Sequence, residues 1–205
     1  MDVDTARGRA RYTLDQPDQP LSLLVLGHGA GGDVDAVDLV AVRDAGLRHG
    51  VAVALVTQPY RVAGRRAPAP AAHLDDAWLA VIAALRAAVP EIAALPLVVG
   101  GRSSGARVAC RTARAAGADG VVALAFPLHP PGRPERSRAD ELGTGLPTLV
   151  VNGDRDPFGV PEPGPLVDLV CRPGERHDLR RDPDAVGAAV VGWLAAHGWA
   201  RRDPA

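Results

Sequence analysis

Six short apolar runs, separated by segments of mixed character, constrain the fold of this chain more than any other feature. Most of the runs are continuously apolar and do not alternate with polar residues, which is typical of parallel strands covered on both faces. We therefore predict a buried strand at each run. The runs cover residues 21–27, 51–57, 95–100, 120–126, 147–153 and 165–171.

Amphipathic segments lie between these predicted strands. Their apolar residues recur at helical spacing, which indicates helices with one buried face. Asp75 and Asp76 suit the first turn of one helix, where carboxylates are favoured, and Pro183 suits the first turn of another. The predicted helices cover residues 33–49, 74–89, 104–116 and 183–197.

The repeated order of strand and helix predicts an α/β fold with a doubly wound, mostly parallel sheet and right-handed crossovers. The sequence RARYTLD, at residues 9–15, indicates an additional antiparallel edge strand. No internal repeat or linker divides the chain, so we expect a single domain over residues 1–205.

Composition excludes several classes of function. The formal net charge is −1, which argues against general binding of nucleic acid or of a membrane surface. Cys110 and Cys171 belong to no CxxC pair or His/Cys cluster, so we expect neither a structural zinc site nor a disulfide framework. Residues 1–20 are mostly polar, and no apolar run reaches the ~18 residues of a membrane span. We expect a soluble, cytoplasmic protein.

The chain has only four serines, and two of them stand side by side between glycines. Gly101-Arg102-Ser103-Ser104-Gly105 matches G-x-S-x-G, the nucleophile elbow, between a predicted strand and a predicted helix. Chance placement would produce such a match about 0.05 times in this composition. The alternative is a glycine-rich turn in which Ser104 only caps the helix. We predict that Ser103 is a nucleophile.

A serine nucleophile needs a base and an orienting carboxylate, which follow it in the order Ser, acid, His in this kind of fold. His177 follows the last predicted strand and is the expected base. His28 and His129 lie in suitable loops but precede the acid, so we expect them to line the pocket instead. Three others lie on or beside predicted helices: His49, His73 and His197.

The acid is Asp154 or Asp156, which both follow the predicted strand 147–153. Spacing alone does not decide between them. Asp156 precedes Pro157, which places its carboxylate on a stiff turn farther from the strand, and we favour it. Asp154 would then hydrogen-bond to the backbone of the loop.

The sequence LGHGAGGD, at residues 26–33, follows the first predicted buried strand. Its glycines allow backbone N–H groups to point toward the nucleophile. The N–H of Ala30, with Gly31 as a further candidate, can pair with the N–H of Ser104 to hold a tetrahedral oxyanion. One such donor is worth about 3 kcal/mol of transition-state stabilisation.

The same loop also fits a rival interpretation. Gly27, Gly29 and Gly32 match G-x-G-x-x-G, the dinucleotide-binding pattern. However, Thr57 and Gln58 end the second predicted strand, where a dinucleotide site needs an acidic residue for the ribose. We therefore favour the oxyanion loop.

Two Pro/Arg-rich stretches, residues 59–72 and 127–138, follow strand ends at the edge where such sheets build their sites. Neither is long enough for a full cap domain. Arg65 and Arg66 are candidates for binding a substrate carboxylate or phosphate. Because every one of the 23 basic residues is arginine, solvated loop charge is the interpretation we favour. Arg102, inside the elbow, is expected to brace a neighbouring loop.

Together these stretches resemble the α/β-hydrolase superfamily, and more narrowly the small, cap-poor hydrolases related to dienelactone hydrolases. That group includes relatives of the testis-expressed protein thirty and of a non-specific-lethal chromatin-complex subunit. The arginine before the nucleophile and the sequence DPFG carry the narrower resemblance. The resemblance implies a triad of Ser103, Asp156 and His177 and oxyanion donors at Ala30 and Ser104. The mechanism expected from these residues needs no metal or organic cofactor.

The chain departs from that group at two positions. Ala106 stands where many relatives have a second glycine, and Ser104 where many have methionine. Neither change removes a catalytic atom. We expect a serine hydrolase that cleaves an ester or thioester of a small acyl molecule through an acyl-enzyme. The alternatives are acyl transfer to an acceptor other than water and a non-catalytic interaction domain that retains the fold.

Overall fold

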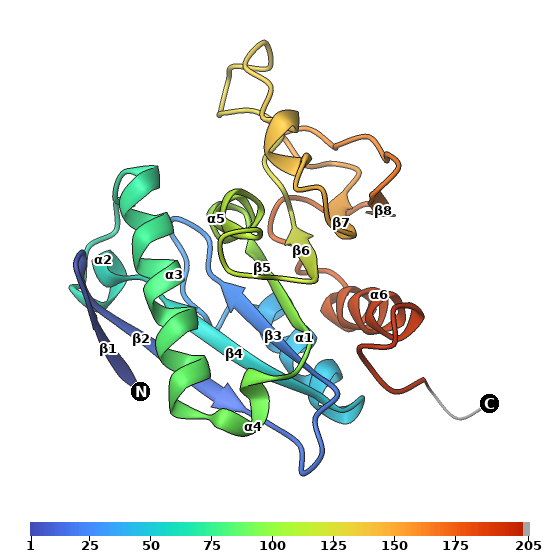
Figure 1. Cartoon of the computed structure of the whole chain (residues 1–205). Coiled ribbons are helices and arrows are strands. Elements are labelled where there is room, and N and C mark those ends of the chain that lie inside the picture. Colours follow the sequence, from blue (N-terminus) through green and yellow to red (C-terminus); the bar gives the residue numbers. More distant parts are fainter. Residues whose placement is uncertain (203–205) are drawn as a thin grey trace.

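The computed structural model describes residues 1–202, which form a single eight-stranded sheet with helices on both faces (Figure 1). The strand order is β1-β2-β4-β3-β5-β6-β7-β8. The six strands from β3 to β8 are parallel, whereas β2 pairs antiparallel with β1 and with β4. The strands are β1 (Asp2–Thr5), β2 (Gly8–Asp15), β3 (Ser22–Gly27), β4 (Val51–Thr57), β5 (Leu97–Arg102), β6 (Gly120–Leu124), β7 (Thr148–Gly153) and β8 (Val167–Arg172).

The helices cover the sheet in two layers. Helices α1 and α6 pack against each other on one face, and α3 and α5 lie on the other. This arrangement confirms the doubly wound α/β fold. The helices are α1 (Val37–Arg48), α2 (Pro59–Val62), α3 (Ala71–Ala88), α4 (Pro90–Ala93), α5 (Ser104–Thr112) and α6 (Pro183–Ala196), with a short 3-10 helix η1 (Ala139–Leu142).

The central strands are apolar throughout because both faces are buried. In β3, Leu23 and Val25 belong to the core under α3 and α5, while Leu24 and Leu26 belong to the core under α1 and α6. All four side chains are completely buried. Each strand therefore contributes alternate residues to two separate cores, as the continuous apolar runs predicted.

The edge beyond β4 differs from the prediction. The segment expected to form an edge strand is β2, but β1 pairs outside it and is the outermost strand. The residues of β1 alternate between exposed and half-buried. Its four residues therefore lack the apolar run that identified the central strands.

Two helix starts also differ. Helix α1 begins at Val37 instead of residue 33, and the Asp33 carboxylate accepts a hydrogen bond from the N–H of Val34 in the loop before it. Helix α3 begins at Ala71, so Asp75 and Asp76 lie beyond its first turn. They form ion pairs with Arg111 and Arg7 instead. These two carboxylates are therefore stabilised by tertiary ion pairs and not by the helix dipole.

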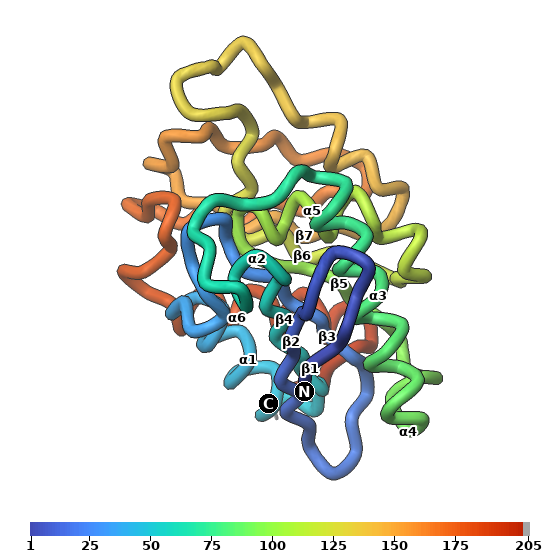
Figure 2. The backbone as a smooth tube through the Cα atoms, turned by 90° about the vertical axis from the view of Figure 1, so that its left-hand side faces the viewer, coloured from blue at the N-terminus to red at the C-terminus, as the bar shows by residue number. Residues whose placement is uncertain are grey.

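The carboxyl edge of the sheet is open. The connection between β6 and β7, residues 125–147, has η1 as its only helix and forms the yellow loop at the top of Figure 2. No separate cap domain covers this edge in the part of the chain that the structure describes. Within residues 1–202, no helix combines the length and apolar character needed to cross a membrane.

Candidate active site

The turn between β5 and α5 holds Ser103 in a strained backbone conformation, with φ of 53° and ψ of −107°. Its backbone N–H donates to the carbonyl oxygen of Leu124 at 2.9 Å. A Cβ atom on Gly101 or Gly105 would overlap the carbonyl oxygen of Gly27. The glycines of the motif therefore let β3 approach the turn closely, and the turn brings Ser103 to the carboxyl edge of the sheet.

Three side chains far apart in the chain meet at this edge. Nε2 of His177 lies 2.8 Å from Oγ of Ser103, and Nδ1 of His177 lies 2.8 Å from Oδ2 of Asp156. Because a carboxylate can only accept, we assign the imidazole proton to Nδ1, which leaves Nε2 to accept from the hydroxyl. The Asp156 side chain is fully buried, and that of His177 is 20% exposed.

The Asp156 carboxylate is fixed by its own turn. Its Oδ1 accepts from the backbone N–H of Phe158 at 2.9 Å, and the Asn152 side-chain amide donates to Oδ2 at 3.4 Å. The ring of Phe158 also packs edge-on against the imidazole of His177, with centroids 4.4 Å apart. The turn that carries the acid therefore also positions the base.

Asp154 has a different partner. Its Oδ1 accepts from the backbone N–H of Gly174 at 2.7 Å, and the residue is exposed. This contact joins the loop after β7 to the loop after β8. The sequence predicts this bond to the loop backbone for Asp154, with Asp156 as the acid.

The interpretation of Ser104 as a helix cap is wrong. Helix α5 begins at Ser104, so Ser103 occupies the N-cap position, and no side-chain capping hydrogen bond forms there. The hydroxyl of Ser103 contacts His177 instead. The serine pair is therefore not explained by helix capping.

Two side chains orient the loop after β3. The Nδ1 atom of His28 donates to the carbonyl oxygen of Gly29 at 2.8 Å, and its Nε2 accepts from the backbone N–H of Gln58 at 3.1 Å. Burial lowers the pKa of His28, which favours the neutral imidazole that this pattern requires. In a trans peptide the C=O and the following N–H point in opposite directions. His28 therefore sets the direction of the Ala30 N–H.

The neighbouring peptide is fixed in the same way. The hydroxyl of Tyr60, in α2, donates to the carbonyl oxygen of Ala30 at 2.8 Å. This contact orients the peptide that carries the N–H of Gly31. Burial raises the pKa of Tyr60 to about 12, so its hydroxyl stays protonated at neutral pH. Sequence reasoning missed Tyr60, because a four-residue helix after a strand gives no periodic signal.

The glycines of the same loop do not support a dinucleotide site. A dinucleotide-binding loop opens directly into a helix, whose N-terminus holds the pyrophosphate. Here α1 begins only at Val37, and a Cβ atom on Gly27 would come within 3.2 Å of the Trp78 ring and 3.4 Å of Gly105. Close packing of β3 against the elbow accounts for Gly27.

Arg102 braces neighbouring loops, as the sequence predicted. Its Nε lies 2.9 Å from the Asp38 carboxylate, and its Nη2 donates to the carbonyl oxygen of His177 at 3.0 Å. Asp38 lies in the first turn of α1 and is completely buried. Nothing in the sequence singled out Asp38, because a carboxylate in a first helical turn is ordinary.

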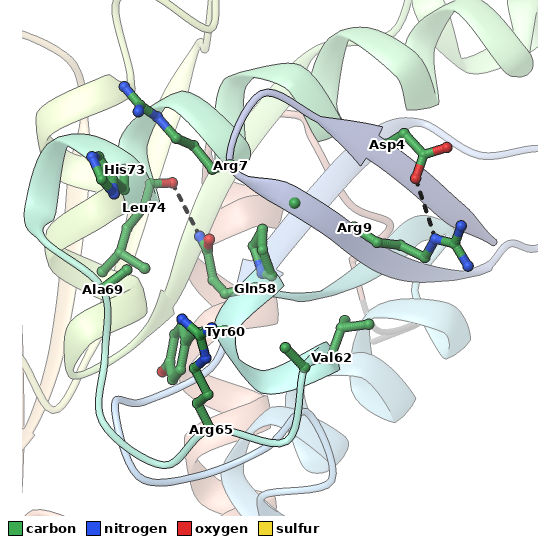
Figure 3. Close-up of a pocket in the computed structure, with 13 residues that line it drawn as sticks. Asp4, Arg7, Arg9, Gln58, Tyr60, Val62, Arg65, Ala69, His73 and Leu74 are labelled. Atoms are coloured by element: carbon green, nitrogen blue, oxygen red, sulfur yellow. Dashed lines mark hydrogen bonds and ion pairs between the residues drawn. The ribbon is translucent and has the colours of Figure 1, made fainter.

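The other predicted pocket residues lie farther apart. His129 is half-buried in the loop after β6, and its Nδ1 lies 3.0 Å from the carbonyl oxygen of Pro130. A cavity of about 520 Å³ lies beside Tyr60, between the β1–β2 turn, α2 and α3 (Figure 3). Arg65 lines this cavity, whereas Arg66 is exposed and does not. Within residues 1–202, no cluster of three or more His, Cys, Asp or Glu could hold a metal ion.

A family model described as an alpha/beta hydrolase domain matches residues 20–163, which is more than half of the chain. The chain belongs to the α/β-hydrolase family. The matched region includes the loop after β3, the elbow and Asp156, and it ends before His177. Family membership supports a hydrolytic activity.

Solved α/β hydrolases have the same fold. A serine hydrolase without a lid from Xanthomonas campestris has a TM-score of 0.74 at 20% identity, over 100% of this chain and 95% of that chain. Dienelactone hydrolase from Anabaena variabilis has a TM-score of 0.74 at 17% identity, over 98% and 97%. Est1E from Butyrivibrio proteoclasticus has a TM-score of 0.76 at 18% identity, over 96% and 97%. A search of the curated proteins finds no match.

Proposed function

We propose that this α/β hydrolase is a serine hydrolase that cleaves an ester or thioester of a small acyl substrate through an acyl-enzyme. One observation carries the proposal. The imidazole of His177 bonds to the Ser103 hydroxyl through one nitrogen and to the buried Asp156 carboxylate through the other, each at 2.8 Å. This is the relationship that a nucleophile, a base and an orienting acid require.

In the first half of the reaction, Nε2 of His177 takes the hydroxyl proton of Ser103, and Oγ attacks the acyl carbon. Asp156 stabilises the imidazolium that forms. The N–H groups of Ala30 and Ser104 hold the oxyanion, with Gly31 as a further donor. When the tetrahedral intermediate collapses, the bond to the alcohol or thiol breaks, and the imidazolium gives its proton to that leaving group.

In the second half, water replaces the leaving group. His177 takes a proton from water, the hydroxide oxygen attacks the acyl carbon, and a second oxyanion forms at the same donors. Collapse releases the carboxylic acid, and the proton returns to Ser103. An acceptor other than water would give acyl transfer by the same steps.

The test is hydrolysis of a panel of p-nitrophenyl esters and acyl thioesters with acyl chains of two to twelve carbons. Wild type should turn over one class at least 10³-fold faster than Ser103→Ala, since the triad supplies factors of that order or larger. Equal rates for the two proteins across the panel would reject the proposal. A folded wild type without turnover would instead favour a non-catalytic interaction domain.

The remaining expectations from the sequence stay predictions. They are a cytoplasmic location, a small-molecule partner without nucleic acid or membrane, one domain over the whole chain, and activity without a metal or organic cofactor. His129, Arg65 and Arg66 remain candidates for substrate binding.

A further inference from the structure

The side chain of Arg102 lies beside the loops that carry two of the proposed catalytic groups, His177 and the N–H of Ala30. Arg102 immediately precedes Ser103 at the end of β5. Its Nη2 donates to the backbone carbonyl of His177 at 3.0 Å. A Cβ atom on Gly29 would lie 3.4 Å from its Nη1, so the guanidinium also borders the loop that carries Ala30. One planar group next to the nucleophile therefore bonds to the loop of the base and borders the loop of the oxyanion donor.

The guanidinium is itself fixed from behind by Asp38. The two charges lie 2.9 Å apart, with the Asp38 side chain completely buried and that of Arg102 15% exposed. A buried carboxylate is costly unless it is paired, so this ion pair resists separation. The first turn of α1 adds favourable helix-dipole potential at Asp38. Arg102 is thus tied to a rigid helix that contributes no atom to the proposed reaction.

Arg102 contacts the loop after β8 at His177 itself. His177 lies in residues 173–182, which form turns and bends between β8 and α6. In this loop, Leu179 has a positive φ of 45°, a backbone conformation that residues other than glycine rarely adopt. Asp156 orients the imidazole, but the bond from Arg102 is made to the backbone of His177. The two contacts fix different parts of the same residue.

We infer that Arg102 is a positioning residue for the proposed hydrolysis. Its guanidinium, held and neutralised by Asp38, keeps the backbone of His177 where the imidazole meets the Ser103 hydroxyl. Arginine suits this role because one planar group places Nε 2.9 Å from the Asp38 carboxylate while Nη2 donates to His177. A lysine ammonium is a single point on a flexible chain and cannot reproduce both contacts. The inference rests on the proposed function.

The variants distinguish two effects of Arg102: its hydrogen bond to the backbone of His177, and its neutralisation of the buried Asp38 carboxylate. Arg102→Met alone would leave Asp38 buried and unpaired, so the double variant Arg102→Met/Asp38→Asn is used. Asp38→Asn alone keeps a side-chain oxygen for Arg102 and preserves its bond to His177. Arg102→Lys keeps the charge and loses the fork. Arg107→Met is the matched control, because Arg107 pairs with Glu141 and not with the loop of His177.

We expect Arg102→Lys and the double variant to lower kcat by about 10- to 100-fold, with KM within about twofold of wild type, because small misplacements of a base have effects of this size. Arg107→Met should keep kcat within about threefold, and Asp38→Asn should lose less than Arg102→Lys, because its side-chain oxygen still lies beside Arg102. A double variant with wild-type kcat would overturn the inference. So would Arg107→Met losing as much as the double variant, since the loss would then not be specific to the contact with His177.

Hydrogen exchange supplies a readout that needs no turnover. In the double variant, the amides of residues 173–182 should exchange about tenfold faster than in wild type, while Arg107→Met leaves them unchanged. Unchanged exchange in the double variant would overturn the inference even if the protein hydrolyses esters. If wild type hydrolyses nothing, the proposed function fails, and the exchange experiment still decides whether Arg102 holds this loop.

Discussion

The hydroxyl of Tyr60 donates a 2.8 Å hydrogen bond to the carbonyl oxygen of Ala30, across two loops that follow neighbouring strands. This bond orients the peptide between Ala30 and Gly31. The N–H of Gly31, the further candidate for an oxyanion donor, is therefore held by a side chain that touches no reacting atom. Tyr60 and His28 together fix two successive peptides of this loop.

Replacement of Tyr60 by phenylalanine removes this bond and keeps the ring. We expect kcat to fall about tenfold, less than the 10²–10³ that follows loss of an oxyanion donor, because the loop loosens but its N–H groups remain. Steady-state kinetics with one activated ester measures the effect. A Tyr60→Phe enzyme with wild-type kcat would show that this loop needs no such support.

The two aspartates after β7 should have opposite effects. Asp156→Asn removes the charge that orients and stabilises the imidazole of His177, and kcat should fall by about 10³- to 10⁴-fold with little change in fold. Asp154→Asn should change kcat less than about threefold, because its partner is the backbone of Gly174. The comparison is made at saturating ester, and an equal loss in the two variants would contradict this assignment of the acid.

Stability below neutral pH should depend on His28. Burial lowers its pKa in the folded state below the ordinary value of 6.5. Its contribution to stability is therefore complete above pH 6.5 and is lost as the pH falls toward the folded-state pKa, because the unfolded chain then binds the proton more readily. Urea unfolding at pH 8, 6.5 and 5 measures the free energy of unfolding of wild type and of His28→Gln. The difference between the two should become smaller as the pH falls. A constant difference would mean that the protonation of His28 is not linked to folding.

Neutralising Arg65 tests whether the cavity beside Tyr60 selects charged substrates (Figure 3). If it does, Arg65→Gln raises KM about tenfold for a p-nitrophenyl ester with a terminal carboxylate, but not for the neutral ester of equal length. Arg66→Gln is the matched control, because Arg66 does not line the cavity. Equal behaviour of the two variants toward both esters would leave the loop arginines as solvated charge.

The central sheet and the three residues that meet at its edge could be predicted because their signals are local. Continuous apolar runs identify strands buried on both faces, and parallel strands end at the same edge. The G-x-S-x-G motif around Ser103 directly predicts the turn that carries the nucleophile. Given this nucleophile, chain order and the position of the other histidines on or beside helices leave one suitable histidine, His177, and two aspartates two residues apart, Asp154 and Asp156.

The supporting residues could not be predicted in the same way. Asp38 and Tyr60 act through contacts with Arg102 and Ala30, which only the folded chain brings together. The short strand β1 is half-exposed and polar, so periodicity does not reveal it. Asp75 was expected to stabilise a helix terminus but pairs with Arg111 of another helix. Local sequence patterns are enough to predict where the site lies. The contacts that position its residues form only in the folded chain.

The most direct measurement is the intact mass of the protein after exposure to a fluorophosphonate probe, which phosphonylates an activated serine. Wild type should gain the mass of one probe, mapped by peptide digestion to Ser103, while Ser103→Ala gains none and His177→Gln reacts at least 100-fold more slowly. A folded wild type that gains no adduct, or a Ser103→Ala protein that is labelled equally, would contradict the account.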